Sequence, residues 1–349
     1  MAWIAVAMLA TVAHAQSARA ETPAGPRAVG VSILHLNISN LDQSLALYRD
    51  VLGMEVKTPP GPPRSAPALV SEPGALLRTA IMHVPGGSFE FELVEWSGIP
   101  QQPQQAHIQD PGAVMLALSV RDLDAMMAGA KKLGLQVLTS GGKPLVGERD
   151  GKRTRTVMIR DRDGFVVELV EGGPNATAAS GPISHVAVYL SVQDLAQTVT
   201  FYNRAFGFNM PAPGEARPTP ERIQALFDDK ALKTMRSAQG TFPGSEFIIT
   251  FQEFRGPNQK PVRHRVQDPG GGLLIVSVQE FPAVMDLIRT NGGIVGSGTS
   301  SETLAADART SWARDPNGLL MMVTPPRPPG AAGPAGPAPP GAPTSARPQ

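Results

Sequence analysis

The stretch Asn40-Leu-Asp-Gln-Ser-Leu-Ala-Leu-Tyr-Arg-Asp-Val-Leu-Gly53 carries an apolar residue at every third or fourth position. The spacing i, i+4, i+7 and i+11 predicts one buried face of a helix, formed by Leu41, Leu45, Tyr48 and Leu52. Gly53 is suited to follow the end of that helix, because glycine readily adopts the left-handed conformation found there. The stretch therefore predicts a helix over 41–52.

The same helical pattern occurs a second time, and two other segments are repeated with it. The second helix is marked by Leu195, Val199, Tyr202 and Phe206 and is followed by Gly207. An Asp-Pro-Gly turn precedes an apolar strand at 110–112 and again at 268–270. A four-residue turn ending in glycine precedes another strand at 161–164 and at 315–318. Three matches in the same order indicate that the chain is an internal duplication.

Each half also divides into two similar modules. The first half predicts a strand, a helix and three strands over 31–96, and the same order again over 114–171. The second half repeats this order, and the segment 172–182 between the halves is rich in glycine, proline and small polar residues. The predicted fold class is α+β, with four βαβββ modules in tandem.

These modules resemble the vicinal oxygen chelate superfamily, which includes glyoxalase I, bleomycin and fosfomycin resistance proteins and extradiol dioxygenases. The resemblance rests on the stretch 40–53, on Ser119-Val-Arg-Asp-Leu123 and on the strand segment 161–171. It implies two half-open barrel domains, over 31–171 and, in degenerate form, over 183–324. It also implies a divalent metal ion (Fe, Mn, Ni, Co or Zn) that binds vicinal oxygens of a small molecule.

The resemblance points to three metal ligands in the first half. Glu92 and Glu168 occupy the positions of the family's ligand glutamates, and each interrupts an apolar strand. His35 is the nearest ligand on the first strand, although the family's spacing points to Ile33. The fourth position is occupied by Met115, which is no ligand for such a metal. The alternative interpretation of each glutamate is a carboxylate at a solvated strand end, or one paired with an arginine such as Arg155.

The second half lacks ligands at the four corresponding positions, which are Ala187, Thr250, Leu273 and Met322. This favours a domain without metal. Three other side chains in the first half are weaker candidates for chemistry, because each has a plain surface role as its alternative: His83, His107 and Arg155.

The two ends of the chain differ from the rest. Residues 1–20 combine a short apolar run with small-residue cleavage sites, which predicts a signal peptide and an exported protein, periplasmic or secreted. The segment 325–349 holds ten Pro, four Gly and six Ala, a composition typical of a disordered tail. No further segment predicts a membrane span once the signal peptide is removed.

Composition narrows the function classes. The 31 basic and 30 acidic residues nearly balance, which argues against a nucleic-acid-binding protein. The chain has no cysteine, which excludes disulfides and thiolate metal sites. Three functions stay open. The first two are a metal-dependent lyase, isomerase or dioxygenase acting on a small oxygenated molecule, and a protein of the same fold that only binds such a molecule. The third, which ranks behind them, is a structural or interaction protein that its tail holds at the cell envelope. The oligomeric state also stays open, between a monomer and a homodimer.

Overall fold

The computed structural model describes residues 25–85, 90–149, 151–173, 181–257, 259–296 and 310–326, except for the side chains of residues 32 and 33. The predicted signal peptide and nearly all of the predicted tail lie outside the described residues. No helix in the described ranges is long and apolar enough to cross a membrane.

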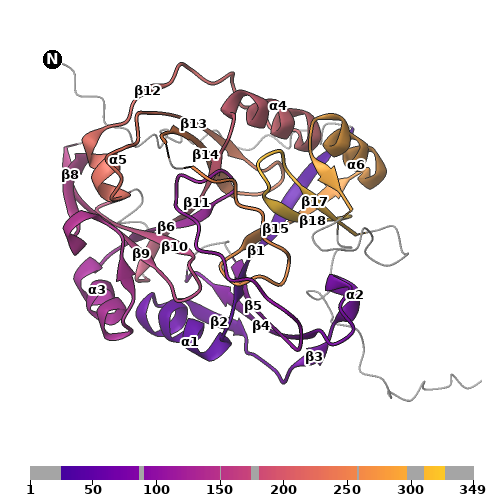
Figure 1. Ribbon diagram of the computed structural model, residues 1–349, viewed down its shortest axis with the longest axis horizontal. Coiled ribbons are helices and arrows are strands. Elements are labelled where there is room, and N and C mark those ends of the chain that lie inside the picture. Colours follow the sequence, from indigo (N-terminus) through magenta and orange to yellow (C-terminus); the bar gives the residue numbers. More distant parts are fainter. Residues whose placement is uncertain are drawn as a thin grey trace, which may run out of the picture.

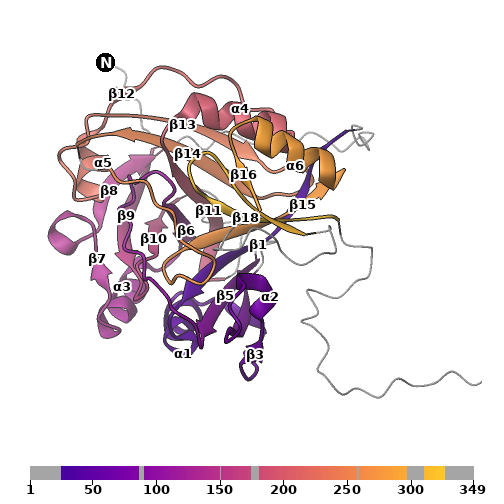
Figure 2. The ribbon, with the colours of Figure 1, turned by 45° about the vertical axis from the view of Figure 1, so that its right-hand side comes forward.

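The strands form two mixed sheets, sheet A and sheet B, and both stay open rather than closing into barrels (Figures 1 and 2). The order in sheet A is β16 (Ile294–Val295), β17 (Ser311–Arg314), β18 (Leu320–Thr324), β15 (Gly272–Gln279), β1 (Arg27–Ile38), β5 (Glu90–Ser97), β4 (Leu76–His83) and β2 (Glu55–Thr58), with β3 (Arg64–Ser65) beside β4.

Sheet B repeats this architecture. Its order is β12 (Arg217–Pro218), β13 (Thr234–Thr241), β14 (Ile248–Arg255), β11 (Ile183–Val192), β6 (Val114–Val120), β10 (Val166–Glu171), β9 (Lys152–Arg160) and β7 (Gln136–Val137), with β8 (Leu145–Arg149) beside β9.

Each sheet takes one module from each half of the chain. In sheet A the central pair is β1 with β15, and in sheet B it is β11 with β6; both pairs are antiparallel. The first module therefore shares a sheet with the fourth, and the second with the third. The predicted α+β class and the four modules are confirmed, but the sheets do not follow the boundary between the halves.

The helices, in contrast, pack within a half. The predicted helix over 41–52 is α1 (Leu41–Leu45), continued by the π-helical η1 (Ala46–Val51), and it contacts α3 (Leu123–Lys132). In the second half α4 (Leu195–Phe206) contacts α6 (Phe281–Thr290). Figure 1 shows the first pair at the lower left and the second at the upper right. Helix packing thus joins the modules of one half, while strand pairing joins the two halves.

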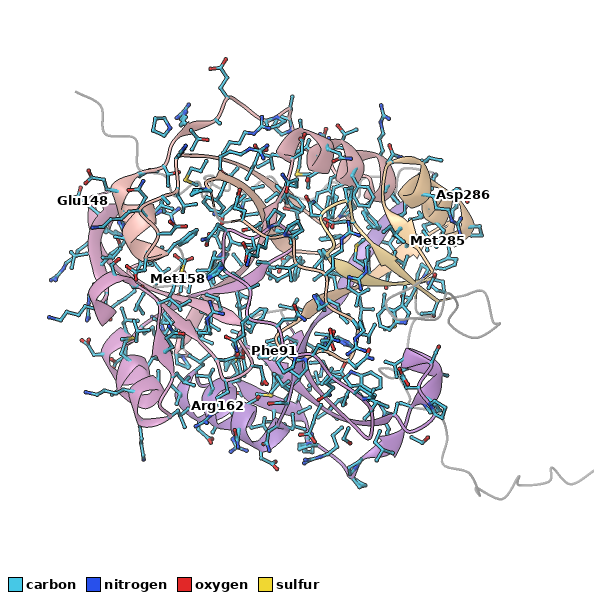
Figure 3. All side chains as sticks on the ribbon, in the orientation of Figure 1. Phe91, Glu148, Met158, Arg162, Met285 and Asp286 are labelled. Atoms are coloured by element: carbon cyan, nitrogen blue, oxygen red, sulfur yellow. The ribbon has the colours of Figure 1, made fainter. Side chains whose placement is uncertain are left out.

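The main core lies between the helices and one face of each sheet. On β1 the alternate residues Leu34, Leu36 and Ile38 pack in this core with Tyr48. Figure 3 shows all the side chains, among them Phe91, which belongs to this core, and the exposed Glu148, Arg162 and Asp286. Because side chains alternate along a strand, the residues between the core positions point to the opposite face of each sheet, which we call its inner face.

Three short helices were not predicted from the sequence. They are α2 (Pro67–Val70), α5 (Glu221–Leu226) and the 3-10 turn η2 (Ser140–Gly142). Two of them pack on the inner faces: Val70 of α2 lies in an apolar cluster with β5, and Leu226 of α5 lies in one with β6. Helices of four and six residues carry too few turns to show an apolar periodicity, which explains the omission.

Candidate functional site

Two of the three predicted metal ligands meet on the inner face of sheet A. His35 of β1 stands directly opposite Glu92 of β5 in the parallel register of these strands. The imidazole Nε2 lies 2.8 Å from Oε2 of the carboxylate. The family's spacing pointed instead to Ile33, two residues earlier. The pairing of β1 with β5 places His35 at the level of Glu92, and the pairing of β1 with β15 has a register shift just before it, between residues 31 and 33.

The His35–Glu92 contact is close but is not a well-aligned hydrogen bond. Nε2 of His35 is buried and has no partner of proper hydrogen-bond geometry, despite the short distance. Burial of Glu92 would raise the pKa of its carboxyl, but His35, the Thr79 hydroxyl and the charge of Arg64 outweigh this effect and lower the pKa below its usual value. Glu92 is therefore an ionised carboxylate, and the imidazole beside it has an Nε2 that makes no well-aligned hydrogen bond with the protein.

Further unpaired polar atoms lie along the same face. Asn37 is two residues after His35 on β1, and both its amide nitrogen and its amide oxygen are buried without a partner. The indole nitrogen of Trp96, four residues after Glu92 on β5, is buried and unpaired as well. Buried polar atoms nearly always have hydrogen-bond partners, so a run of unpaired ones calls for an explanation.

The other half of this face is apolar. Opposite His35 in the antiparallel register stands Leu273 of β15, and Ile275 follows on the same strand. Met322 of β18 and Trp312 of β17 extend this wall, and α2 covers one end, where the Trp312 indole donates a hydrogen bond to the Leu69 carbonyl. The inner face of sheet A therefore joins a polar half from the first module to an apolar half from the fourth.

The third predicted ligand lies elsewhere. Glu168 belongs to β10 in sheet B, between Ala117 of β6 and Met158 of β9. Val167 and Leu169 face the main core, so Glu168 points to the inner face of sheet B. The structure thus brings His35 and Glu92 together and places Glu168 in the other sheet, because the first two modules of the chain do not share a sheet.

The side chains present do not fit the metal site that the family implies. In sheet A the fourth module offers Leu273 beside His35, and Met322 on β18. In sheet B the row beside Glu168 consists of Ala117 and Ala187, with Met115 and Tyr189 two residues away along their strands. Nowhere in the described ranges do three or more His, Asp or Glu side chains come close enough to share a metal ion. Two protein donors are fewer than the three that a typical catalytic zinc site uses.

The three weaker candidates from the sequence are Arg155, His107 and His83. Arg155 forms ion pairs with Asp124 and Glu171. His107 is largely exposed, with Nδ1 3.4 Å from a carboxylate oxygen of Asp110. His83, at the end of β4, pairs with Glu90 of β5 in the strand register. None of these three side chains extends the His35–Glu92 pair.

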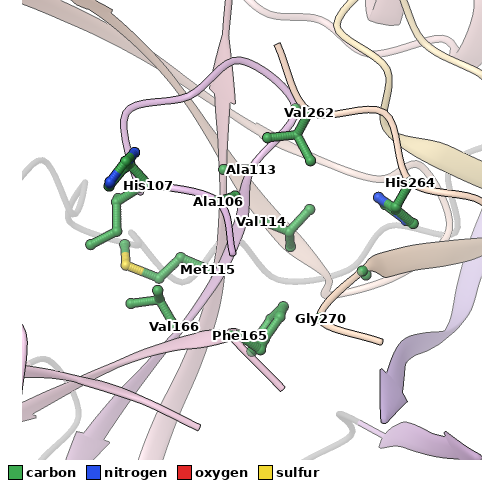
Figure 4. A pocket seen from close by; sticks show the side chains of 15 residues that line it. Ala106, His107, Ala113, Val114, Met115, Phe165, Val166, Val262, His264 and Gly270 are labelled. Carbon is green, nitrogen blue, oxygen red and sulfur yellow. The ribbon is translucent and has the colours of Figure 1, made fainter. Parts of the chain in front are cut away.

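A small cavity lies between the loops that lead into β6 and β15, next to Met115 and Val166 of sheet B (Figure 4). Its volume is about 20 Å³, enough for one water molecule. His264 lines it, with a buried and unpaired Nε2, and burial together with the charge of Arg314 lowers its pKa to about 4. The cavity is too small for a metabolite, so it is no candidate for the principal site.

Comparisons with known proteins identify a family for the first half of the chain and a similar overall fold. The model of the Glyoxalase/Bleomycin resistance protein/Dioxygenase superfamily matches residues 30–169. These residues form a domain of this superfamily. Glyoxalase I from Zea mays is similar in fold, with 16% sequence identity, a TM-score of 0.50, and coverage of 86% of this chain and 92% of that chain. The fosfomycin resistance protein FosX from Mesorhizobium loti is 16% identical over 42% of this chain and 93% of its own, with a TM-score of 0.27. A search of curated proteins gives no match.

Sequence reasoning missed two residues of this candidate site, Asn37 and Trp96. The signal for Asn37 was an amide inside the apolar strand segment 34–38, on the same face as His35. Nothing in the sequence marks Trp96 as unpaired, because an indole nitrogen usually finds a carbonyl near its strand.

Proposed function

We propose that this chain binds a small oxygenated molecule on the inner face of sheet A, with His35 and Glu92 as the polar anchor. One observation supports this most: both amide atoms of Asn37 and the Trp96 indole nitrogen are buried without hydrogen-bond partners on the face that carries the His35–Glu92 contact. An unsatisfied buried polar group costs about 1–3 kcal/mol. A ligand that hydrogen-bonds to these atoms recovers that energy on binding.

The available groups define the ligand's chemistry. Trp96 is a donor only, and Asn37 offers both a donor and an acceptor. Glu92, as a carboxylate, accepts a hydrogen bond from a donor such as a hydroxyl group. The wall formed by Leu273, Ile275 and Met322 suits an apolar or aromatic surface on the other side of the ligand. Neighbouring oxygens on a compact apolar frame, as in a catechol, match both halves of the face.

A second candidate function is catalysis by acid–base chemistry, as a lyase or isomerase. It is favoured by the contact between His35 and the ionised Glu92, since a carboxylate next to an imidazole holds that ring in place as a proton acceptor. A dioxygenase, or another enzyme that depends on a resident metal, requires at least one more donor than the two that sheet A supplies.

We also propose that the protein is exported, on the strength of the predicted signal peptide over 1–20. The mass of the mature N-terminus, measured on protein expressed from the full gene and recovered outside the cytosol, tests this. A chain that retains Met1 would contradict it.

Catechol is the probe for the binding proposal. In a calorimetric titration we expect catechol to bind the wild-type protein, and cyclohexane-1,2-diol and phenol to separate the contributions of the ring and of the second oxygen. Glu92→Gln and Asn37→Leu should each weaken binding. Glu168→Gln, which alters the other sheet, is the matched control and should leave it unchanged. Equal catechol binding by all three variants would overturn the assignment to sheet A.

An α-hydroxyketone such as hydroxyacetone separates the two candidates, because it carries a proton α to a carbonyl that an acid–base enzyme can remove, whereas catechol carries none. If that proton exchanges with solvent deuterium in the presence of the protein, and Glu92→Gln abolishes the exchange, the acid–base function replaces simple binding. Exchange no faster than in buffer favours the binding function.

A further inference from the structure

Arg222 of α5 is a half-buried cation without an ion-pair partner. One guanidinium nitrogen, Nη2, donates a hydrogen bond to the Thr156 hydroxyl at 3.0 Å. In the part of the chain that the structure describes, Arg222 attracts Glu168 electrostatically but forms no ion pair with it or with another carboxylate. A half-buried arginine side chain is usually paired with a carboxylate. The remaining N–H groups of Arg222 are therefore available to hydrogen-bond a ligand.

The strand beneath Arg222 is shaped to admit its side chain. Gly147 of β8 lies against the guanidinium, and a Cβ atom built at Gly147 would sit 1.6 Å from Nη1 of Arg222. Any other residue at position 147 would therefore displace the arginine. Together with the hydrogen bond to Thr156, this close approach fixes Arg222 over the inner face of sheet B.

Glu168 is the second unpartnered group on this face. Its side chain makes no hydrogen bond or ion pair with the described residues, although it lies deep enough for burial to raise its pKa to about 7. Beside it in the strand register stands Ala117, and beside Ala117 stands Ala187 of β11. The neighbours on that side are thus the two smallest side chains of the row, while Met158 of β9 stands on the other side of Glu168.

The groups around this area are donors or cations. His185 of β11 has a buried, unpaired Nε2, and burial together with the charge of Arg149 lowers its pKa. Tyr189, on the same strand, carries a hydroxyl whose deprotonation is opposed by burial and by the charge of Glu168. Apart from Glu168, every polar group facing this area can donate a hydrogen bond, which favours a ligand that accepts them.

We propose that the inner face of sheet B binds a small carboxylate between Arg222 and Glu168. The ligand accepts hydrogen bonds from the guanidinium on one side and from the O–H of a protonated Glu168 on the other. An ionised Glu168 would repel the ligand, so a protein molecule whose Glu168 is ionised takes up one proton from solution when the carboxylate binds. This site is independent of the oxygenated-molecule site proposed for sheet A.

The raised pKa of Glu168 places the proton uptake near neutral pH. Below about pH 7 Glu168 already carries the proton, and the affinity for the carboxylate is constant. Above about pH 7 each pH unit lowers the fraction of protein with a protonated Glu168 by about tenfold, and the affinity falls with it. The other groups facing Glu168 are Arg222, Arg149, His185 and Tyr189. Of these, His185 has a lowered pKa and Tyr189 a raised one, so both shifts lead away from the pH at which Glu168 titrates.

Propionate is a suitable probe, with propionamide as its uncharged analogue. By calorimetry we expect propionate to bind the full-length protein at about pH 6 and about tenfold more weakly at about pH 8. Proton uptake should show as a heat that varies with the ionisation enthalpy of the buffer. Propionamide should bind at least tenfold more weakly, because it lacks the charge that Arg222 recognises.

Three variants test the two partners separately. Glu168→Gln keeps a hydrogen-bond donor that cannot ionise, so propionate binding should persist and become independent of pH. Arg222→Gln should weaken binding about 10- to 100-fold. His35→Ala, in sheet A, should leave it unchanged. Circular dichroism and the unfolding midpoint show whether each variant is folded.

The proposal is overturned if the folded wild-type protein gives no propionate signal at about pH 6. It is also overturned if Glu168→Gln retains the wild-type pH dependence, because the proton would then be taken up elsewhere. Failure of catechol binding has no bearing on either result, since that experiment reports on sheet A.

Discussion

The hydroxyl of Tyr48 donates a hydrogen bond to Asp161 across a separation of 113 residues, at 3.0 Å. Tyr48 belongs to the helix over sheet A, and Asp161 opens the turn into β10 of sheet B. The second half repeats the contact between Tyr202 and Asp315, at 3.3 Å. Both tyrosines are fully buried. The two repeated motifs of the sequence, the helix tyrosine and the aspartate of the turn, thus meet in space and connect the sheets.

Replacing Asp161 with Asn should change the pH dependence of stability. Burial and the neighbouring Asp163 raise the pKa of Asp161 to about 7, against 3.8 in the unfolded chain. A carboxyl with a raised folded-state pKa contributes stability that is complete below about pH 4 and is lost as the pH rises towards 7. Asn at 161 does not ionise and can still accept the two backbone N–H bonds.

The measurement is the free energy of unfolding in urea at about pH 4.5 and about pH 8. Relative to the wild type, Asp161→Asn should gain stability with rising pH, by up to about 1.4 kcal/mol for each pKa unit of the shift. Parallel curves for the two proteins would show that Asp161 has an ordinary pKa in the folded protein. Asp122→Asn, at an exposed helix cap, serves as a control without this gain.

The sequence predicted the helices and strands of this fold better than it predicted which strands pair with each other. The apolar stripe around Tyr48, the repeated turns and the period of the strands are local features, and they located the principal helices and strands to within a few residues. Which module shares a sheet with which depends on contacts between distant segments, such as β1 with β15. The local sequence pattern would be the same if each half formed its own sheet or if, as observed, the two halves contribute one module each to both sheets.

For the same reason only part of the candidate site was predicted correctly. His35 and Glu92 belong to one module, and the register within that module brings them together. Glu168 was grouped with them on the assumption that the first two modules share a sheet, and it stands in the other one. The unpaired state of Asn37 and Trp96 depends on what surrounds them, which no local pattern contains.

Asn37→Leu should stabilise the protein while weakening ligand binding. Both polar atoms of the Asn37 amide are buried without partners, and leucine has nearly the same shape. Removing them should raise the free energy of unfolding by about 1–3 kcal/mol. Thermal unfolding with and without catechol measures both effects. A loss of stability in the unliganded variant would indicate that Asn37 is hydrogen-bonded to water in the free protein.

Gly147→Ala should displace Arg222 and remove carboxylate binding. The added methyl group would lie within 1.6 Å of the guanidinium, while the backbone at this position is acceptable for alanine. Propionate affinity at about pH 6 should fall about tenfold or more, as for Arg222→Gln. Gly214→Ala is the matched control, because a Cβ there meets nothing within 4 Å. Wild-type affinity in Gly147→Ala would contradict the role of Arg222.

The metal content of the purified protein should be well below one ion per chain. Sheet A supplies two donors, His35 and Glu92, and apolar side chains occupy the opposing positions. Elemental mass spectrometry on protein without a histidine tag, after incubation with Fe, Mn, Ni, Co or Zn and desalting, measures this. About one ion per chain, lost in both Glu92→Ala and His35→Ala, would contradict the expectation and restore the metal-dependent functions; loss in Glu168→Ala alone would place the ion in sheet B.

Cutting the chain between its halves should leave one folded particle. Both sheets are built across the halves, through β1 with β15 and β6 with β11, so separation would expose two long strand edges on each half and part of each core. A protease site inserted into the segment 174–180 allows the intact protein to be cut after folding. Native mass spectrometry should then find the two fragments together at the mass of the whole chain, and they should separate only in denaturant. Fragments that part under native conditions and each keep a folded spectrum would show that the halves are independent domains.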